Sequence, residues 1–149
     1  MKQEEITKCT KVVELFRSMM DELGDMCVVY DVSFGFIVLE YYMDGYFENN
    51  SNYDNAEDLY HHLLDKWKFC WIVDKAKVNG TEEFEDYEPS LTKEQRAERD
   101  KALAHFEGGY RSGYDGQKRK NEESFNHFKC ITRYYIYRYL MERSLMRVE

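Results

Sequence analysis

Residues 26–48, MCVVYDVSFGFIVLEYYMDGYFE, carry the strongest signals for the fold class. Two runs within this stretch, residues 26–32 and 34–43, are rich in β-branched and aromatic side chains, which favour strands. Asp44-Gly45, which precedes residues 46–48, is a strong hairpin signal because a type I′ turn requires positive φ at both central positions. The stretch therefore predicts a three-stranded antiparallel meander whose last strand is short.

Helical patterns flank this meander on both sides. Upstream, residues 4–23 repeat apolar side chains at steps of three and four, and Gly24 is a natural helix stop. This amphipathic helix is expected to cover one face of the sheet. Downstream, residues 49–55 predict a polar loop, and Asp54, three residues before Glu57, indicates the start of a second helix.

Residues 69–78 leave two alternatives open. They either extend the second helix or form a strand that turns at Asn79-Gly80, and the run Phe-Cys-Trp-Ile-Val favours the strand. An acidic connector follows. Ser90 or Thr92 is then expected to cap a further helix that runs through Phe106.

The C-terminal part combines a loop and a helix. Residues 108–120 predict a flexible Gly-rich loop, and residues 108–116 hold four of the eight glycines. Residues 121–147 predict a long C-terminal helix with one apolar stripe, formed by Cys130, Tyr134, Tyr137, Met141 and Leu145. We therefore expect residues 1–149 to form a single α+β domain, in which an N-terminal helix packs on a small antiparallel sheet and further helices follow.

Composition argues against several classes of protein. The four cysteines are scattered and form no CxxC pair, so neither a zinc site nor a disulfide scaffold is expected. The N-terminus lacks the basic and apolar regions of a signal peptide, and no run approaches the roughly 18 apolar residues of a membrane span. The net charge of −8 disfavours generic binding to nucleic acid or to an anionic membrane. We expect a cytoplasmic protein that does not bind membranes.

Motifs that carry chemistry fail at their defining positions. An EF-hand-like loop starting at Asn50 has Asn55 where glycine is required and His61 where glutamate is required. Gly108 and Gly113 have P-loop spacing, but Tyr114 occupies the lysine position. HExxH and GxSxG motifs are absent from the sequence. We therefore expect no enzyme activity, no cofactor and no metal.

Negative charge is concentrated in one part of the chain. From Ser18 to Asp65 the sequence holds 11 Asp and Glu and no Lys or Arg. Neighbouring carboxylates repel, which costs some stability even at exposed sites. Tyrosines lie among these acids and offer apolar contact beside the charges. Carboxylates on a rigid scaffold can imitate a row of phosphates and enter a basic groove.

This pattern predicts a non-enzymatic binding protein that blocks the basic, nucleic-acid-binding groove of a nuclease or a CRISPR-type effector. Composition and size resemble those of phage-encoded anti-CRISPR and anti-defence inhibitors and of nuclease immunity proteins, although no motif matches either group. The expected partner-binding residues are Asp44, Tyr46, Glu48, Tyr53, Asp54, Glu57 and Asp58, with the two tyrosines as aromatic anchors. A second acidic group is expected to extend this surface: Glu82, Glu83, Glu85, Asp86 and Glu88.

The alternative is a nucleic-acid-binding or regulatory protein. Residues 108–120 interleave tyrosines with Arg111, Lys118, Arg119 and Lys120, a composition that stacks on bases and tracks phosphates. The predicted C-terminal helix adds a basic stripe, formed by Lys129, Arg133, Arg143 and Arg147. The same stripe can instead neutralise the acidic part of the chain, either within the fold or across a homodimer.

Overall fold

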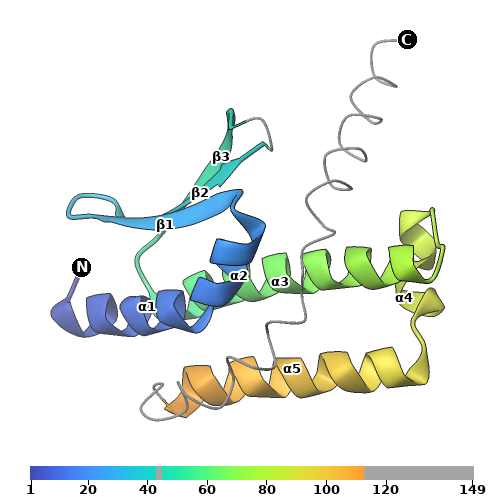
Figure 1. The fold of residues 1–149 in the computed structure, drawn as a ribbon. Coiled ribbons are helices and arrows are strands. Elements are labelled where there is room, and N and C mark those ends of the chain that lie inside the picture. Colours follow the sequence, from blue (N-terminus) through green and yellow to red (C-terminus); the bar gives the residue numbers. More distant parts are fainter. Residues whose placement is uncertain (43–44, 113–149) are drawn as a thin grey trace.

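The computed structural model describes residues 1–42 and 45–112 (Figure 1). Its fold is α+β, with N-terminal helices, a three-stranded antiparallel sheet and further helices, as predicted. The elements are α1 (Gln3–Leu15), α2 (Arg17–Leu23), β1 (Met26–Asp31), β2 (Gly35–Tyr41), β3 (Phe47–Tyr53), α3 (Ala56–Val78), the 3₁₀ turn η1 (Phe84–Asp86), α4 (Tyr87–Ser90) and α5 (Lys93–Ser112). Asp44 of the predicted hairpin turn and the predicted helix over residues 121–147 lie outside the described residues.

The sheet has the order β1-β2-β3, and both neighbouring pairs are antiparallel, which confirms the predicted meander. The third strand is longer than predicted. Residues 49–53, expected in a loop, continue the pairing with β2, so that Asn49 lies opposite Glu40 and Tyr53 opposite Phe36. Ladder hydrogen bonds to β2 hold this Asn- and Ser-rich segment as an edge strand, although its intrinsic preference is for loops.

The helix predicted over residues 4–23 is divided at Phe16 into α1 and α2. The backbone N–H of Phe16 donates to the carbonyls of Val12 at 3.3 Å and Val13 at 3.2 Å, so the chain tightens there before α2 begins. α2 ends at Gly24, as predicted. Gly24 has a φ of 63°, and its N–H donates to the Met20 carbonyl at 2.9 Å.

Residues 69–78 are helical, so the preference for a strand is wrong. The apolar run that suggested a strand also has helical spacing: Leu63, Trp67 and Trp71 are all buried and recur at steps of four. Burial of these side chains against the other helices extends α3 through Val78. In this segment packing overrides the local preference of aromatic and β-branched residues for strands.

Asn79-Gly80 ends a helix rather than a hairpin strand. Gly80 has a φ of 73°, and its N–H donates to the Lys77 carbonyl at 2.9 Å. The N–H of Thr81 donates to the Ala76 carbonyl at 2.8 Å. Together these bonds form a Schellman motif, which satisfies carbonyls left open at the helix end.

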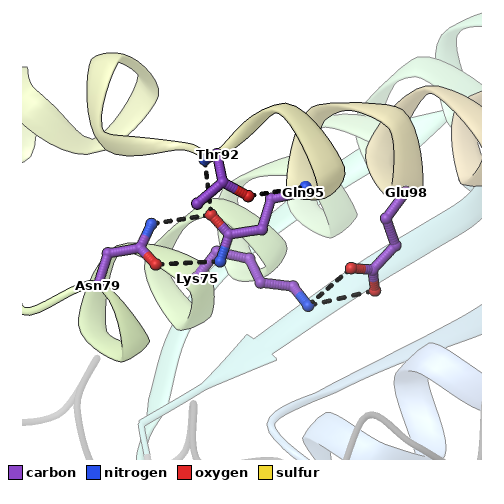
Figure 2. Close-up of polar contacts among 5 residues, drawn as sticks. All are labelled: Lys75, Asn79, Thr92, Gln95 and Glu98. Atoms are coloured by element: carbon purple, nitrogen blue, oxygen red, sulfur yellow. Dashed lines mark hydrogen bonds and ion pairs between the residues drawn. The ribbon is translucent and has the colours of Figure 1, made fainter.

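α5 begins at a capping box formed by Thr92 and Gln95 (Figure 2). The N–H of Gln95 donates to Thr92 Oγ1 at 3.2 Å, and the N–H of Thr92 donates to Gln95 Oε1 at 2.9 Å. The Gln95 side chain also exchanges hydrogen bonds of 2.9 and 3.0 Å with Asn79 at the end of α3. Lys75 and Glu98 add an ion pair at 3.0 Å, so the end of α3 and the start of α5 hold each other in place.

α5 continues past Phe106 to Ser112, so residues 108–112 are helical and not part of a loop. Gly109 faces α1: a Cβ at this position would lie 2.6 Å from Leu15 Cδ1. Glycine at position 109 therefore allows α1 and α5 to pack closely, which is a different role from the flexibility that the glycines suggested. The rest of the predicted loop, residues 113–120, lies outside the described residues.

The core lies between the helices and one face of the sheet. In Figure 1, α1, α2 and α3 lie on the same side of the sheet, and one hydrophobic cluster joins residues of these helices, of β1, β2 and of α5. The largest fully buried side chains of this cluster are Phe16, Phe106, Leu59, Leu63, Val38 and Cys9.

Candidate partner-binding surface

The predicted partner-binding residues fall into two groups at opposite ends of β3. Tyr46 and Glu48 lie at the hairpin end, whereas Tyr53 and Asp54 lie where the chain passes from β3 to α3. At about 3.3 Å per residue, the strand between Glu48 and Tyr53 separates the two groups by roughly 17 Å. The sequence suggested one continuous surface, and the described residues form two smaller ones.

The hairpin end combines an exposed carboxylate with exposed aromatic rings. Tyr46 is 73% exposed and Phe47 is 54% exposed. The register shifts between Glu40 and Tyr41, which leaves Glu48 as the extra residue of a bulge. Glu48 is exposed and makes no ion pair with any residue that the structure describes.

The second group surrounds the N-terminus of α3. Asn55 is the N-cap, a role that the sequence suggested for Asp54: its Oδ1 accepts from the Asp58 N–H at 2.9 Å. The Asn55 Nδ2 donates to Asp58 Oδ2 at 2.8 Å and to Asp54 Oδ1 at 3.2 Å. Asp54, Glu57 and Asp58 are exposed, and within residues 1–42 and 45–112 none of them pairs with Lys or Arg.

The acids at the start of α3 also stabilise that helix, independently of any partner. Negative side chains in the first turn interact favourably with the positive end of the helix dipole, typically by 0.3–1 kcal/mol each. A further carboxylate reaches the same helix end from α1, since Glu5 Oε2 accepts from the Ala56 N–H at 3.3 Å. Part of the acidic run therefore stabilises α3, whether or not it also binds a partner.

Tyr53 is half-buried, unlike the exposed anchor that was expected. Its ring packs against the core cluster, and its hydroxyl lies 2.5 Å from His62 Nδ1. Burial lowers the pKa of His62, and the nearby Lys66 adds to this effect whereas Glu40 opposes it. The Tyr53–His62 contact joins β3 to α3, so Tyr53 contributes to the shape of the surface from beneath it.

Three acids of the run are paired within the fold: Asp65 pairs with Lys68 at the surface, and Asp25 and Glu40 share Lys66. Lys66 Nζ lies 3.2 Å from Glu40 Oε1 and 3.8 Å from Asp25 Oδ2, and all three side chains are largely buried. Burial disfavours the charged form of Lys66, but Asp25 and Glu40 outweigh it and raise the Lys66 pKa. Lys66 follows the acidic run directly in sequence, and the fold places its ammonium group beside two carboxylates from within that run.

The second acidic group lies at the opposite end of α3. Helix α3 is 23 residues long, which corresponds to about 34 Å. Glu88 pairs with Arg99 on α5, whereas Glu82, Glu83, Glu85 and Asp86 are exposed and form no ion pair inside the described part of the chain. These acids therefore do not extend the surface at the start of α3, and they form a separate patch.

The basic residues of the alternative prediction are described only in part. Arg111 is exposed near the end of α5 and pairs with Glu107 at 2.6 Å, whereas Lys118, Arg119 and Lys120 lie outside the described residues. A groove of about 430 Å³ between α1 and α5 brings Arg111 near two other cations. Its lining residues are Lys8, Lys11, Val12, Leu15, Gly109, Tyr110 and Arg111.

The described residues show neither a metal site nor a membrane-spanning helix. No group of three His, Cys, Asp or Glu residues among them is placed to hold a metal ion. Among the same residues, no helix has the length and apolar character needed to cross a membrane.

The sequence prediction missed one exposed surface, the sheet face that points away from the helices. Val29, Ile37 and Leu39 lie on that face, by their register in β1 and β2. The signal was present in the sequence, because residues 36–39 (Phe-Ile-Val-Leu) are apolar without alternation, a pattern typical of strands covered on both faces.

Comparison with known proteins adds no function to these observations. No family model matches the chain, and neither the search of curated proteins nor the search of solved structures gives a match.

Proposed function

We propose that this protein is a non-enzymatic binding protein that blocks a basic groove of a partner protein with exposed carboxylates. The partner class is a nuclease or a CRISPR-type effector whose groove normally holds nucleic acid. The observation that carries the proposal is the set of exposed carboxylates on β3 and at the start of α3 without ion pairs among the described residues: Glu48, Asp54, Glu57 and Asp58.

Electrostatics favour such a role. Residues 1–112 carry 24 Asp and Glu against 13 Lys and Arg, a net charge of −11. A field of one sign steers a partner of opposite sign and raises the association rate. Because the backbone that carries these carboxylates is already ordered in a strand and a helix, binding has to immobilise only their side chains, and more of each charge-assisted contact remains as affinity than on a disordered segment.

The two groups define what the partner must offer. Basic side chains roughly 17 Å apart would meet Glu48 at one end of β3 and the acids at the start of α3 at the other. Tyr46, which is exposed near Glu48, adds apolar contact at the first of these positions. A groove that binds nucleic acid carries several Lys and Arg side chains that neutralise phosphates, and these are the groups that the carboxylates would meet.

The test compares two variants with the same loss of charge. Glu48→Gln, Asp54→Asn and Glu57→Gln together neutralise the proposed contacts, whereas Glu82→Gln, Glu83→Gln and Glu85→Gln neutralise three acids at the far end of α3. Both proteins, with the wild type, are used to capture partners from an extract of the native host, and captured proteins are identified by mass spectrometry.

We expect the wild type and the far-end variant to capture the same basic protein and the first variant to lose it. Each charge-assisted hydrogen bond contributes about 1.5–3 kcal/mol, so the loss of three such contacts abolishes capture. The captured protein should also release labelled DNA in a gel-shift assay when this protein is added. Equal loss of capture in both variants would assign the effect to net charge alone. Undiminished capture by both would show that these carboxylates are not contacts, and either result would contradict the proposed surface.

The groove between α1 and α5 supports a second candidate function, binding of nucleic acid by the chain itself. It brings Lys8 and Lys11 together with Arg111, and the basic Lys118, Arg119 and Lys120 follow in the sequence. A gel-shift titration at two salt concentrations tests it. Binding that weakens as salt rises, and that is lost when Lys118, Arg119 and Lys120 are changed to glutamine, would favour this function.

A further inference from the structure

On the sheet face that points away from the helices, the side chains of β1 and β2 are mostly apolar, and Asn50 and Asn52 of β3 lie on the same face. The register places Cys27 opposite Leu39, Val29 opposite Ile37 and Tyr41 opposite Phe47 on this face. The Tyr41 and Phe47 rings contact each other edge to face, with centroids 6.2 Å apart. We call these six residues the outer face.

None of the described helices covers the outer face. In Figure 1, α1, α2 and α3 all lie on the other side of the sheet, and the six residues belong to neither of the hydrophobic clusters found among the described residues. Val29 is 41% exposed and Phe47 54% exposed. A contiguous apolar surface of this kind marks a contact with another element or another molecule.

β2 has the composition of a strand whose two faces are both covered. Phe36 and Val38 are buried against the helices, while Ile37 and Leu39 point to the outer face. A sheet that leaves one face in water normally alternates apolar and polar side chains, and a run that is apolar on both faces is typical of a strand covered on both faces. The composition of β2 therefore favours a second layer on the outer face.

We propose that residues 121–147 of this same chain provide that layer. They lie outside the described residues, and the sequence gives them one apolar stripe at helical spacing, from Cys130 through Tyr134, Tyr137 and Met141 to Leu145. In a helix this stripe is about 22 Å long, and β2 is about 20 Å long. The stripe therefore matches the outer face in length as well as in chemistry.

Charge and chain length agree with this occupant. Residues 113–149 carry 8 Lys and Arg against 5 Asp and Glu, a net charge of +3, whereas residues 1–112 carry −11. Attraction between the two parts adds to apolar burial. Residues 113–120 can span up to about 30 Å from the end of α5 at Ser112, comparable to the length of α3.

The native cysteines allow a direct test in the full chain. Cys27 lies on the outer face, whereas Cys9 and Cys70 are buried in the core. Maleimide labelling of the folded protein, followed by mass spectrometry, gives a separate rate for each thiol. We expect Cys27 to be protected in the wild type, and rapid labelling at the rate of a free thiol would overturn the proposal.

Substitutions within residues 121–147 test whether this segment is the one that covers the outer face. Tyr134→Glu with Tyr137→Glu should speed the labelling of Cys27 by about tenfold, the factor that corresponds to a loss of 1.4 kcal/mol of covering free energy. Thr132→Glu is the matched control, because at 100° per residue position 132 lies opposite the stripe, and it should leave the rate unchanged. An unchanged rate in the double variant would also overturn the proposal.

Two further measurements separate the proposed cover from unfolding of the variant and from cover by a second copy of the chain. Cys9 and Cys70 report unfolding, and if they become reactive in the double variant, the milder Tyr137→Ser is used in its place with the same expectation. Labelling is repeated on dilution. Protection of Cys27 that weakens on dilution would mean that a second copy covers the outer face, which would contradict the proposal.

Discussion

The ring of Phe16 stacks on the ring of Phe106, with centroids 4.6 Å apart and planes 11° from parallel. Phe16 lies at the junction of α1 and α2, and Phe106 lies in α5, so this contact joins the two ends of the described chain. Both side chains are almost completely buried. Trp67 of α3 meets the Phe106 ring edge to face at 5.1 Å, which places three helices around one aromatic centre.

Phe106→Ala should destabilise the protein by about 3–5 kcal/mol, because it removes a large buried ring and leaves a cavity between the helices. The free energy of unfolding in urea measures the effect. Phe34→Ala is the matched control, since Phe34 is 64% exposed and its loss should change stability by about 0.5 kcal/mol or less. Equal effects of the two substitutions would show that the aromatic centre does not hold the fold together.

The two adjacent glycines of α5 should respond differently to alanine. Gly108→Ala should stabilise the protein by about 0.5–1 kcal/mol, since nothing lies within 4 Å of the added Cβ and alanine favours the helix. Gly109→Ala should gain less or lose stability, because its Cβ would press on Leu15, which is buried. Thermal unfolding of both variants checks the order, and identical shifts would contradict close packing of α1 on α5.

The parts of the fold that the sequence predicted have local signals. The meander follows from two strand-like runs, and the start of α5 follows from a capping residue, for which the sequence offered Ser90 or Thr92 and the structure uses Thr92. The extent of α3 depends instead on burial of Trp67 and Trp71, which is a property of the assembled core. The role of Gly109 depends on the position of Leu15 in another helix, and no local pattern contains that information.

For the candidate surface, the sequence indicates which residue types are present but not how the fold arranges them. A run without Lys or Arg in sequence says nothing about cations that the fold brings near it. Lys66 reaches Asp25 and Glu40 from α3, so these acids are paired, while Glu48 and Asp54 remain exposed. The direction of Tyr53 toward His62 likewise depends on the contact between β3 and α3.

Lys66→Met should cost about 2–4 kcal/mol, because it leaves two largely buried carboxylates without their cation. Lys68→Met, which breaks the exposed contact with Asp65, is the matched control and should cost about 0.5 kcal/mol or less. Adding Glu40→Gln to Lys66→Met should restore part of the loss, since one unpaired charge is then removed. Urea unfolding of the single and double variants measures each step, and additive losses would exclude coupling between the two side chains.

The stability of the protein should fall as pH drops below about 6.5, and His62 should account for part of the loss. Burial lowers the His62 pKa in the folded state, so the unfolded chain binds the proton more readily. Stability is therefore greatest above the unfolded pKa of about 6.5 and decreases as pH falls from there toward the lowered folded value. Burial also lowers the pKa of His105, so His105 contributes to the same loss of stability at low pH.

His62→Gln should reduce the difference in unfolding free energy between pH 7 and pH 5, because the substituted side chain does not titrate. The exposed neighbour His61 provides the control, and His61→Gln should leave the difference as in the wild type. His105→Gln separates the second contribution. Urea unfolding at both pH values measures all four proteins. A pH dependence that survives unchanged in both His62→Gln and His105→Gln would assign the acid sensitivity to carboxylates instead.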